Sequence, residues 1–388
     1  MRMTYITHTR YPTEKAHGWQ VAQVCQALSR LGHHVTLLHP TVRNDVADDA
    51  WSYYGLQPSF VIQEIKHVDA QASHLIPGPL RFAVAMRIYA RTLRRYFESH
   101  SADLLYVRSP LLLGTLLRTG LPVILELHAL PQHRRARFAR LCNRCRLVVC
   151  LTSFMRDALL KEGASPDRVI VEADGVDPDR FRHLPSPSDA KKHWQLTTPA
   201  PIIGYVGSLA TKDTVEKGVD ELLQALAILK HQSIPAFGWI VGGPEDWKDR
   251  YKKRAGQLGL TDQDVHFEGQ ITTQDVPSAI AACDVCVYPA PRSTDPFFLR
   301  DTSPLKLFEY LAAGRPVVCA DIPPVHDVVD ETSVRFVAPG DGSDLAKGIG
   351  DVLSHSKAAQ ARVKAGLEIV KTHSWEERMR RIVQKLGH

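Results

Sequence analysis

The residues most suited to chemistry gather in residues 295–314, which read DPFFLRDTSPLKLFEYLAAG. This stretch leaves the apolar run DVCVYP, crosses a polar loop and enters a helical pattern at Pro304, where proline suits the first helical position. The start of such a helix offers free backbone amides to an anion, for which a diphosphate is the obvious candidate. Lys306 would add a positive charge, and Glu309 lies close enough to this helix end to reach a sugar or ribose hydroxyl. An amphipathic helix with solvated charges would explain the stretch alone equally well.

A second candidate anion site lies in residues 204–226, GYVGSLATKDTVEKGVDELLQAL. A strand ends at Gly207, and after a polar loop Lys217 and Gly218 open a helix, where lysine can pair with a phosphate. The glycines are not followed by Lys and Ser or Thr as in a Walker loop, and the sequence has no GxGxxG dinucleotide motif.

Two residues in the first half are also candidates. His128 ends the strand pattern PVILELH, so its side chain would face a ligand cleft, although a lone histidine there is more often structural. Gly18 lies in the loop EKAHG before the first helix and allows either a close backbone approach by a ligand or a tight turn.

Three patterns with metal-ligand spacing are weak. Cys142 and Cys145 lie in a basic helical stretch, and Cys283 and Cys286 flank the entry to an apolar strand, where cysteine packs as a small hydrophobe. Residues 262–264 have DxD spacing but fall in a plain turn, where Asp is common. We therefore assign no metal ligand.

The elements that must position these candidates alternate between short apolar runs and longer helical patterns, which predicts parallel sheets covered by helices. Predicted strands in the first half are MTYIT, HVTLLHP, FVIQEI, LLYVR, PVILELH, LVVCLT and VIVEA, and in the second half IIGYVG, FGWIVGG, VHFEG, DVCVYP, PVVCA and VRFV. Predicted helices in the first half include residues 19–31, 80–97 and 134–144. Residues 182–201 are rich in Pro, Ser and Thr and indicate a linker.

We therefore predict an α/β protein of two Rossmann-like domains, residues 1–185 and 186–373, facing a central cleft. Residues 374–388, which have helical periodicity, should pack back on the first domain.

Bulk properties fit this organisation. The chain has 388 residues, 44% of them hydrophobic and 23% charged, as in a soluble globular protein of two domains. Its start, MRMTYITHTR, is too short and polar for a signal peptide, and seven cysteines, an odd number, argue against a secreted disulfide framework. These features predict a cytoplasmic protein. Residues 1–185 hold 24 Lys and Arg against 16 Asp and Glu, a net charge of +8, so an anionic partner is expected there.

Taken together, these stretches resemble the retaining glycosyltransferases of family 4, which have the GT-B fold. The likeness covers nearly the whole chain in the right order, and includes VIVEADGVDPDRF, WIVGGPE, VHFEGQI and SWEERMRRIV. Its most specific element is Asp301 followed by seven residues and Glu309, which is similar to the E-x7-E element of the family with Asp replacing the first Glu.

The resemblance implies a role for each candidate. Glu309 would bind the ribose hydroxyls of a nucleotide sugar, a UDP- or GDP-sugar, and Lys217 would pair with its phosphates. Asp301 would face the donor sugar, together with backbone amides of the turn through Ser303, Leu305 and Lys306. His128 would lie beside the transferred sugar and Gly18 under the diphosphate. No cofactor or metal is expected beyond this co-substrate.

Three positions depart from the family pattern. Ser208 stands where the family usually has the second phosphate-binding Arg, so Lys306 or Arg300 would supply that charge. Asp301 is one methylene shorter than the usual Glu, and Asp174 stands where Asn is usual.

The acceptor is less well defined by the sequence. Two stretches of the basic domain, LRFAVAMRIYARTLRRYF and HRRARFARLCNRCR, mix arginine with apolar residues at helical spacing, as an interfacial helix would. A packed helix with a solvated basic face is the plainer interpretation of each. Together they suggest a glycan, lipid-linked or anionic acceptor and peripheral attachment to a membrane, with no role for nucleic acid. A nucleotide-sugar epimerase and a non-catalytic nucleotide-sugar-binding protein remain alternatives.

Overall fold

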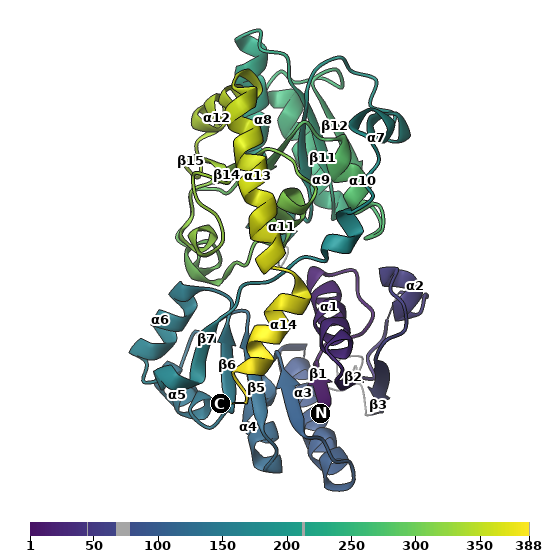
Figure 1. Ribbon diagram of the computed structural model, residues 1–388, viewed down its shortest axis with the longest axis vertical. Coiled ribbons are helices and arrows are strands. Elements are labelled where there is room, and N and C mark those ends of the chain that lie inside the picture. The colour runs from purple at the N-terminus through teal and green to yellow at the C-terminus, as the bar shows by residue number, and fades with distance from the viewer. Residues whose placement is uncertain (45, 67–77, 212–213, 388) are drawn as a thin grey trace. The chain divides into compact units, whose positions relative to one another are not determined.

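A computed structural model describes residues 1–44, 46–66, 78–211 and 214–387 (Figure 1). The chain forms two compact units, Met1–Asp174 with Trp375–His388 and Gly175–Ser374, and each is described by itself.

The first unit is built on a seven-stranded parallel sheet in the order β3-β2-β1-β4-β5-β6-β7. Its strands are β1 (Arg2–Ile6), β2 (His34–Pro40), β3 (Val61–Ile65), β4 (Leu104–Val107), β5 (Val123–Leu127), β6 (Leu147–Cys150) and β7 (Val169–Val171). Every apolar run predicted as a strand in this half is one of them. The chain order reverses between β1 and β4, and ligands of such sheets bind at the carboxyl ends of the strands at this point.

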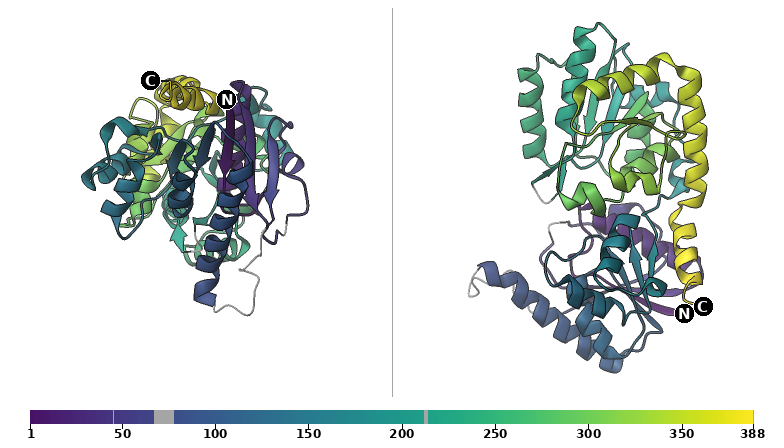
Figure 2. Two further views of the ribbon diagram at one scale, coloured as in Figure 1. Left: turned by 90° about the horizontal axis from the view of Figure 1, so that it is seen from below. Right: turned by 90° about the vertical axis from the view of Figure 1, so that its left-hand side faces the viewer.

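Helices cover both faces of this sheet. On one face α1 (Ala16–Arg30) and α14 (Trp375–Gln384) lie side by side (Figures 1 and 2). On the other, α3 (Gly78–Ser99), α4 (Pro110–Leu116), α5 (Arg135–Cys142) and α6 (Ser153–Lys161) bury their apolar residues in one core cluster. Shorter elements are α2 (Ala50–Tyr54), η1 (Leu117–Thr119) and η2 (Pro166–Arg168). Because strand residues alternate between faces, Leu125 and Leu127 point into this cluster while Glu126 points toward α1 and α14.

The second unit contains a six-stranded parallel sheet in the order β12-β11-β8-β13-β14-β15. Its strands are β8 (Ile202–Val206), β11 (Phe237–Val241), β12 (Val265–Gly269), β13 (Val285–Tyr288), β14 (Val317–Ala320) and β15 (Arg335–Val337), all predicted from the sequence. Both units therefore have the Rossmann strand order, with the reversal between β8 and β13 here. A separate antiparallel pair, β9 (Ala210–Thr211) and β10 (Val215–Glu216), was not predicted, because two-residue strands carry no readable periodicity.

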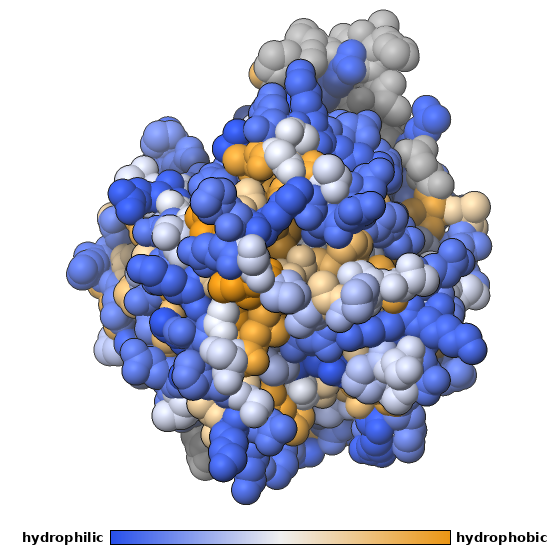
Figure 3. All heavy atoms as spheres, turned by 90° about the horizontal axis from the view of Figure 1, so that it is seen from above, coloured by the Kyte–Doolittle hydropathy of each residue, from blue (hydrophilic) through white to orange (hydrophobic). Residues whose placement is uncertain are grey.

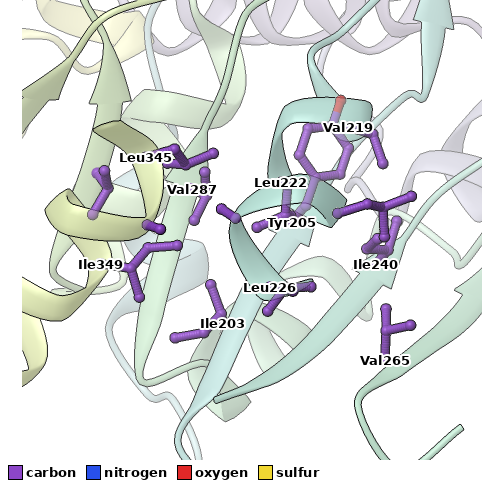
Figure 4. Close-up of a cluster of buried hydrophobic side chains, with 14 of the residues drawn as sticks. Ile203, Tyr205, Val219, Leu222, Leu226, Ile240, Val265, Val287, Leu345 and Ile349 are labelled. Atoms are coloured by element: carbon purple, nitrogen blue, oxygen red, sulfur yellow. The ribbon is translucent and has the colours of Figure 1, made fainter. Parts of the chain in front are cut away.

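The core of the second unit lies between its sheet and a layer of helices that includes α8 (Val219–His231) and α12 (Gly342–Ser354) (Figure 4). The helices are α7 (Pro187–His193), α8 (Val219–His231), α9 (Glu245–Gln257), α10 (Val276–Ala282), α11 (Leu305–Ala312), α12 (Gly342–Ser354) and α13 (Ser356–Thr372). The single-turn elements are η3 (Pro178–Phe181), η4 (Phe297–Asp301) and η5 (Pro323–Asp327). Tyr205, Leu222 and Ile349 are among the fully buried side chains that fill this core.

The predicted linker is wrong in part. Its residues include α7, which Ser186 caps by accepting a hydrogen bond from the amide of Asp189, 3.1 Å away. Lys191 of this helix pairs with Asp284 at 2.7 Å, and Trp194 donates to Ser278 at 2.9 Å. These contacts make residues 186–194 a packed part of the second unit.

The unit boundary lies between Asp174 and Gly175, earlier than the predicted boundary after residue 185. The reason is that residues 175–185 bind within the second unit: the amide of Val176 donates to His373 at 3.0 Å. At the other end Ser374 still belongs to the second unit, and Trp375 begins the segment that returns to the first.

The face seen in Figure 3 is mostly hydrophilic, with hydrophobic side chains visible in narrow strips. Among the described residues no helix is both long and apolar enough to cross a membrane. All seven cysteines are buried, and none of them forms a disulfide.

Candidate functional site

At the carboxyl end of β8 the backbone passes very close to the backbone that follows β11. Gly207 and Gly242 have φ of 150° and 147°, and a Cβ on Gly242 would lie 1.9 Å from the carbonyl oxygen of Gly207. Only glycine fits both positions. The resulting turn brings the chain after β8 against α11.

Lys306 occupies this turn. A Cβ on Gly207 would lie 2.8 Å from Cε and 2.9 Å from Nζ of Lys306. The ammonium group donates to the hydroxyl of Tyr205 and lies 3.9 Å from the centroid of its ring. Tyr310, also on α11, fixes the helix to β8 through hydrogen bonds to the backbone N–H and C=O of Val206, 2.8 and 3.0 Å long. The charge of Lys306 therefore stands beside Ser208, where the usual Arg is missing.

Lys217 is the second cation of this region. It follows β10 and precedes Gly218, which caps α8 in the left-handed conformation. Its Nζ lies 3.5 Å from the centroid of the Phe297 ring in η4. Burial lowers the pKa of Lys306 well below its ordinary value, and the nearby charge of Lys217 lowers it further. The structure thus brings both predicted lysines together with the 295–314 stretch.

Glu309 lies on the same helix and has a partner that the sequence did not reveal. Nη1 of Arg180, in η3, lies 3.5 Å from Oε1 of Glu309. Burial raises the pKa of Glu309, while Arg180 and Lys306 act against that shift. The carboxyl group is therefore held among positive charges, and it can accept hydrogen bonds from a hydroxyl-bearing ligand.

The start of α11 differs from the prediction. The helix begins at Leu305, and Pro304 caps it with a ψ of 68°, so proline is not its first residue. The amide of Leu305 donates to the carbonyl of Ser303 at 3.0 Å, within the turn. Asp301 accepts two hydrogen bonds from Arg300, 2.5 and 3.0 Å long. The amide of Leu305 and the carboxylate of Asp301 therefore both form hydrogen bonds with residues of their own segment.

The three patterns set aside as metal sites have structural roles. Asp264 pairs with Lys230 at 2.7 Å and accepts the amide of Thr261, which makes residues 262–264 a turn. A Cβ on Gly204 would lie 2.1 Å from Sγ of Cys283, which shows how tightly this cysteine packs against β8. Cys142 and Cys145 are buried in the core of the first unit.

Gly18 lies in the first turn of α1 and not in the loop before it. A Cβ at this position would lie 2.1 Å from the hydroxyl of Tyr54 and 2.5 Å from Cγ2 of Thr13. Tyr54 in turn donates to the carbonyl and accepts from the amide of Thr13, both at 2.9 Å. Packing against Tyr54 is thus sufficient to require glycine here.

His128 follows β5, as predicted, and belongs to a buried polar network. Its Nε2 lies 2.8 Å from Oε1 of Glu126 and 3.1 Å from Nε2 of Gln20. Glu126 also accepts from Tyr106 and from Arg378 of α14, the latter at 2.9 Å. Of these contacts, only the one between Glu126 and His128 could have been expected from the sequence, because the two residues are two positions apart.

Further basic residues gather at the switch point of the first unit. Nη1 of Arg108, after β4, lies 3.4 Å from the carbonyl oxygen of His17 in α1. Burial lowers the pKa of His8, after β1, to about 4 and that of His17 to about 3, and Arg108 adds to both shifts. Both rings are therefore neutral at pH 7. The sequence singled out none of these three residues.

Two family models match the two halves of the chain. The one described as Glycosyltransferase Family 4 matches residues 18–180, and the one described as Glycosyl transferases group 1 matches residues 200–355. Among solved structures, HepE from Anabaena in complex with UDP and glucose is 20% identical with a TM-score of 0.73, over 100% of this chain and 99% of that one. A glycosyltransferase from Rickettsia africae is 16% identical with a TM-score of 0.76, over 100% and 97%.

The fold is therefore that of the GT-B glycosyltransferases. The chain belongs to the glycosyltransferases of family 4 and group 1, whose models match successive halves of it.

Curated relatives match a smaller part of the chain. O-antigen chain mannosyltransferase B from Escherichia coli is 22% identical over 233 residues, which are 60% of this chain and 58% of the relative. D-inositol 3-phosphate glycosyltransferase from Salinispora tropica is 24% identical over 299 residues, 70% of this chain and 60% of the relative. The chain thus spans less than two thirds of the length of these relatives.

Proposed function

We propose that this protein is a retaining glycosyltransferase that moves a hexose or related sugar from a UDP- or GDP-sugar to a glycan, glycolipid or small-molecule acceptor. The observation that carries the proposal is the convergence of Lys217, Lys306 and Glu309 at the carboxyl edge of the second sheet. Two cations suit a diphosphate, and a carboxyl group beside them suits ribose hydroxyls.

The chemistry follows from the leaving group. Breaking the bond between sugar and nucleotide leaves a diphosphate with one more negative charge. Lys217 and Lys306 would stabilise that charge without a metal ion, because their positions are fixed before the reaction. A front-face substitution retains the configuration when the departing phosphate oxygen takes the proton of the acceptor hydroxyl. Such a step needs no protein nucleophile.

The test is incubation with a panel of nucleotide sugars and acceptors in the presence of EDTA. We expect release of a nucleoside diphosphate with one donor, together with a glycosylated product. Conversion of the sugar without release would instead identify an epimerase, and binding without turnover a non-catalytic protein. Loss of release in EDTA, restored by Mn²⁺ or Mg²⁺, would contradict the metal-independent mechanism.

Glu309→Ala should weaken nucleoside diphosphate binding by about 1.5–3 kcal/mol, the usual range for a hydrogen bond to a charged group. Calorimetry with the nucleoside diphosphate measures this change. Glu245→Ala is the matched control, since Glu245 is an exposed partner of Lys248 in the same unit. Equal affinities for the Glu309 variant and the control would remove Glu309 from the site.

The acceptor is proposed to bind the first unit. His8, His17 and Arg108 meet at the switch point of its sheet, where a phosphate or hydroxyl group of an acceptor would find hydrogen-bond partners and positive charge. This arrangement supports a lipid-linked or otherwise anionic acceptor.

We also propose peripheral attachment to the inner face of a membrane. Leu80 and Phe82, near the start of α3, are exposed, and the first turns of this helix extend away from the sheet (Figure 2). Three arginines of α3, Arg87, Arg91 and Arg94, are also exposed. Apolar and basic side chains on one helix suit an anionic bilayer surface.

Replacing Arg87, Arg91 and Arg94 of α3 with Ser should release the protein from anionic vesicles. Each basic residue near such a surface contributes roughly 1 kcal/mol, and salt should have the same effect on the unchanged protein. Cosedimentation measures binding. Lys252, Lys253 and Lys357, exposed in the second unit, provide the control with the same charge change. If the unchanged protein does not sediment with anionic vesicles at low salt, its basic surface does not attach it to a membrane.

A further inference from the structure

The buried network behind His128 joins distant parts of the first unit. Arg378 of α14 and Glu126 of β5 both have side chains with 0% exposure, and Nη2 of Arg378 lies 2.9 Å from Oε2 of Glu126. Arg378 is also held by the backbone, because its Nε donates to the carbonyl of Ala173 at 2.6 Å. An ion pair removed this completely from water is costly unless its remaining hydrogen bonds are made.

Glu126 makes those bonds as an acceptor. Its Oε1 accepts from Gln20 at 2.5 Å and from His128 at 2.8 Å, and its Oε2 accepts from Tyr106 and Arg378. Burial alone would raise the pKa of Glu126, but Arg378, His128 and Tyr106 outweigh it and hold the pKa well below its usual value. The carboxylate is therefore ionised and has only lone pairs to offer.

This geometry determines which ring nitrogen of His128 carries the hydrogen. A carboxylate oxygen 2.8 Å from Nε2 requires a hydrogen on that nitrogen, since two lone pairs would repel. The neutral ring then has its lone pair on Nδ1, and its side chain is 19% exposed while Glu126 is fully buried. A ligand can reach the ring of His128 but not the carboxylate behind it.

We propose that Arg378 and Glu126 are positioning residues, which hold His128 as the Nε2–H tautomer so that Nδ1 accepts a hydrogen bond from a hydroxyl group of a sugar substrate. The inference rests on the proposed function, because it takes the ligand of His128 to be a sugar. It also gives the carboxyl-terminal helix a part in the reaction, since Arg378 reaches the site from α14.

Charged and titratable groups surround His128 from each neighbouring element. Burial lowers its pKa, and Arg108 after β4 lowers it further, whereas Glu126 in β5 and Asp174 after β7 raise it. His17 in α1 also interacts with it, and its pKa too is lowered by burial. His128 is thus neutral at pH 7, and removing the charge of Glu126 should move its titration to still lower pH.

The first experiment observes His128 in the full-length protein by nitrogen NMR, with its signals identified by their loss in His128→Asn. We expect hydrogen on Nε2 and none on Nδ1 at pH 7. Glu126→Gln is isosteric, but its amide can donate as well as accept, so part of His128 should shift to the Nδ1–H tautomer and titrate at lower pH. An unchanged tautomer and titration in Glu126→Gln would overturn the proposal.

The second experiment separates kcat from KM. Glu126→Gln and Arg378→Met should lower kcat about tenfold to a hundredfold, by analogy with the loss seen when a residue that orients a metal-bound histidine is replaced. The KM for the nucleotide sugar should stay within about threefold, because the cations that bind diphosphate are untouched. Arg378→Lys, which keeps a positive charge, should recover part of kcat.

Folding defects are controlled by two further variants. If Arg378→Met does not fold, Glu126→Gln combined with Arg378→Met removes both charges and should restore folding with the same shifted tautomer. Arg381→Met is the matched control, because Arg381 lies on the same helix and pairs with the carboxylate of Glu172 at 2.7 Å, away from His128. A loss of kcat in Arg381→Met equal to that in Arg378→Met would overturn the proposal.

The two experiments test different claims, so a negative result in one does not decide the other. If the unchanged protein transfers no sugar from any donor, the proposed function is wrong, and the sugar ligand of His128 falls with it. The NMR measurement still decides whether Glu126 and Arg378 set the tautomer of His128, since it needs no substrate.

Discussion

Lys306→Met should lower kcat by about a hundredfold to a thousandfold, the cost of removing one fixed charge that stabilises a developing anion. Lys306 lies against Gly207 at the end of β8 and is held by the hydroxyl of Tyr205, so its amino group is in place before the donor binds. Release of nucleoside diphosphate from the active donor measures the effect. A loss of less than about threefold would show that Lys306 does not meet the leaving group.

The protonation state of Lys306 provides an independent test of its contact with the diphosphate. Burial and the nearby charge of Lys217 hold its pKa well below the ordinary value. A bound diphosphate would raise that pKa, so binding should take up a proton and weaken as the pH rises. Calorimetry in buffers of different ionisation enthalpy measures the uptake, which should disappear in Lys306→Met.

Arg300→Met distinguishes the two cations that the sequence left open. Arg300 donates two hydrogen bonds to Asp301, whereas Lys306 stands beside the position of the missing Arg at Ser208. We therefore expect Arg300→Met to lower kcat less than Lys306→Met and to leave the proton uptake intact. The opposite order would assign the phosphate contact to Arg300.

The sheets could be predicted because parallel strands buried on both faces appear as short continuous apolar runs. Every such run that was predicted as a strand is one in the structure. The start of α1 was missed because its cap, Lys15, makes no side-chain hydrogen bond and so leaves no signal in the sequence. The start of α11 was placed one residue early for the same reason, since Pro304 caps it without a side-chain bond.

The residues of the site could be predicted where they lie within one short segment of the sequence. Lys306 and Glu309 lie on one helix, and Lys217 precedes another in the same unit, so a pattern of anion-binding turns found them. The partners of the buried carboxylates could not be found in this way. Arg378 and Glu126 are 252 residues apart in the sequence, and an isolated Glu inside an apolar strand does not indicate which cation will meet it.

Arg378→Met should destabilise the first unit by about 3–5 kcal/mol, the cost of leaving one partner of a buried ion pair without the other. Glu126 would remain fully buried with its charge uncompensated. Hydrogen exchange of peptides from β4 and β5 measures the loss, since a chain of two units need not unfold in one step. Arg381→Met should cost less than about 1 kcal/mol, because its pair with Glu172 is partly exposed.

The pH dependence of this loss tests its cause. The folded pKa of Glu126 lies well below its usual value of 4.5, so its ionised form stabilises the unchanged protein above that pH, and this stabilisation fades as the pH falls. In Arg378→Met burial is no longer opposed by the guanidinium, and the pKa of Glu126 should rise above 4.5. Its carboxylate can then take up a proton on mild acidification and cease to be an unpaired charge. The stability difference between the two proteins should therefore shrink as the pH falls from 8 toward about 5. A difference that stays constant over this range would mean that Arg378 stabilises the unit by packing and not by compensating Glu126.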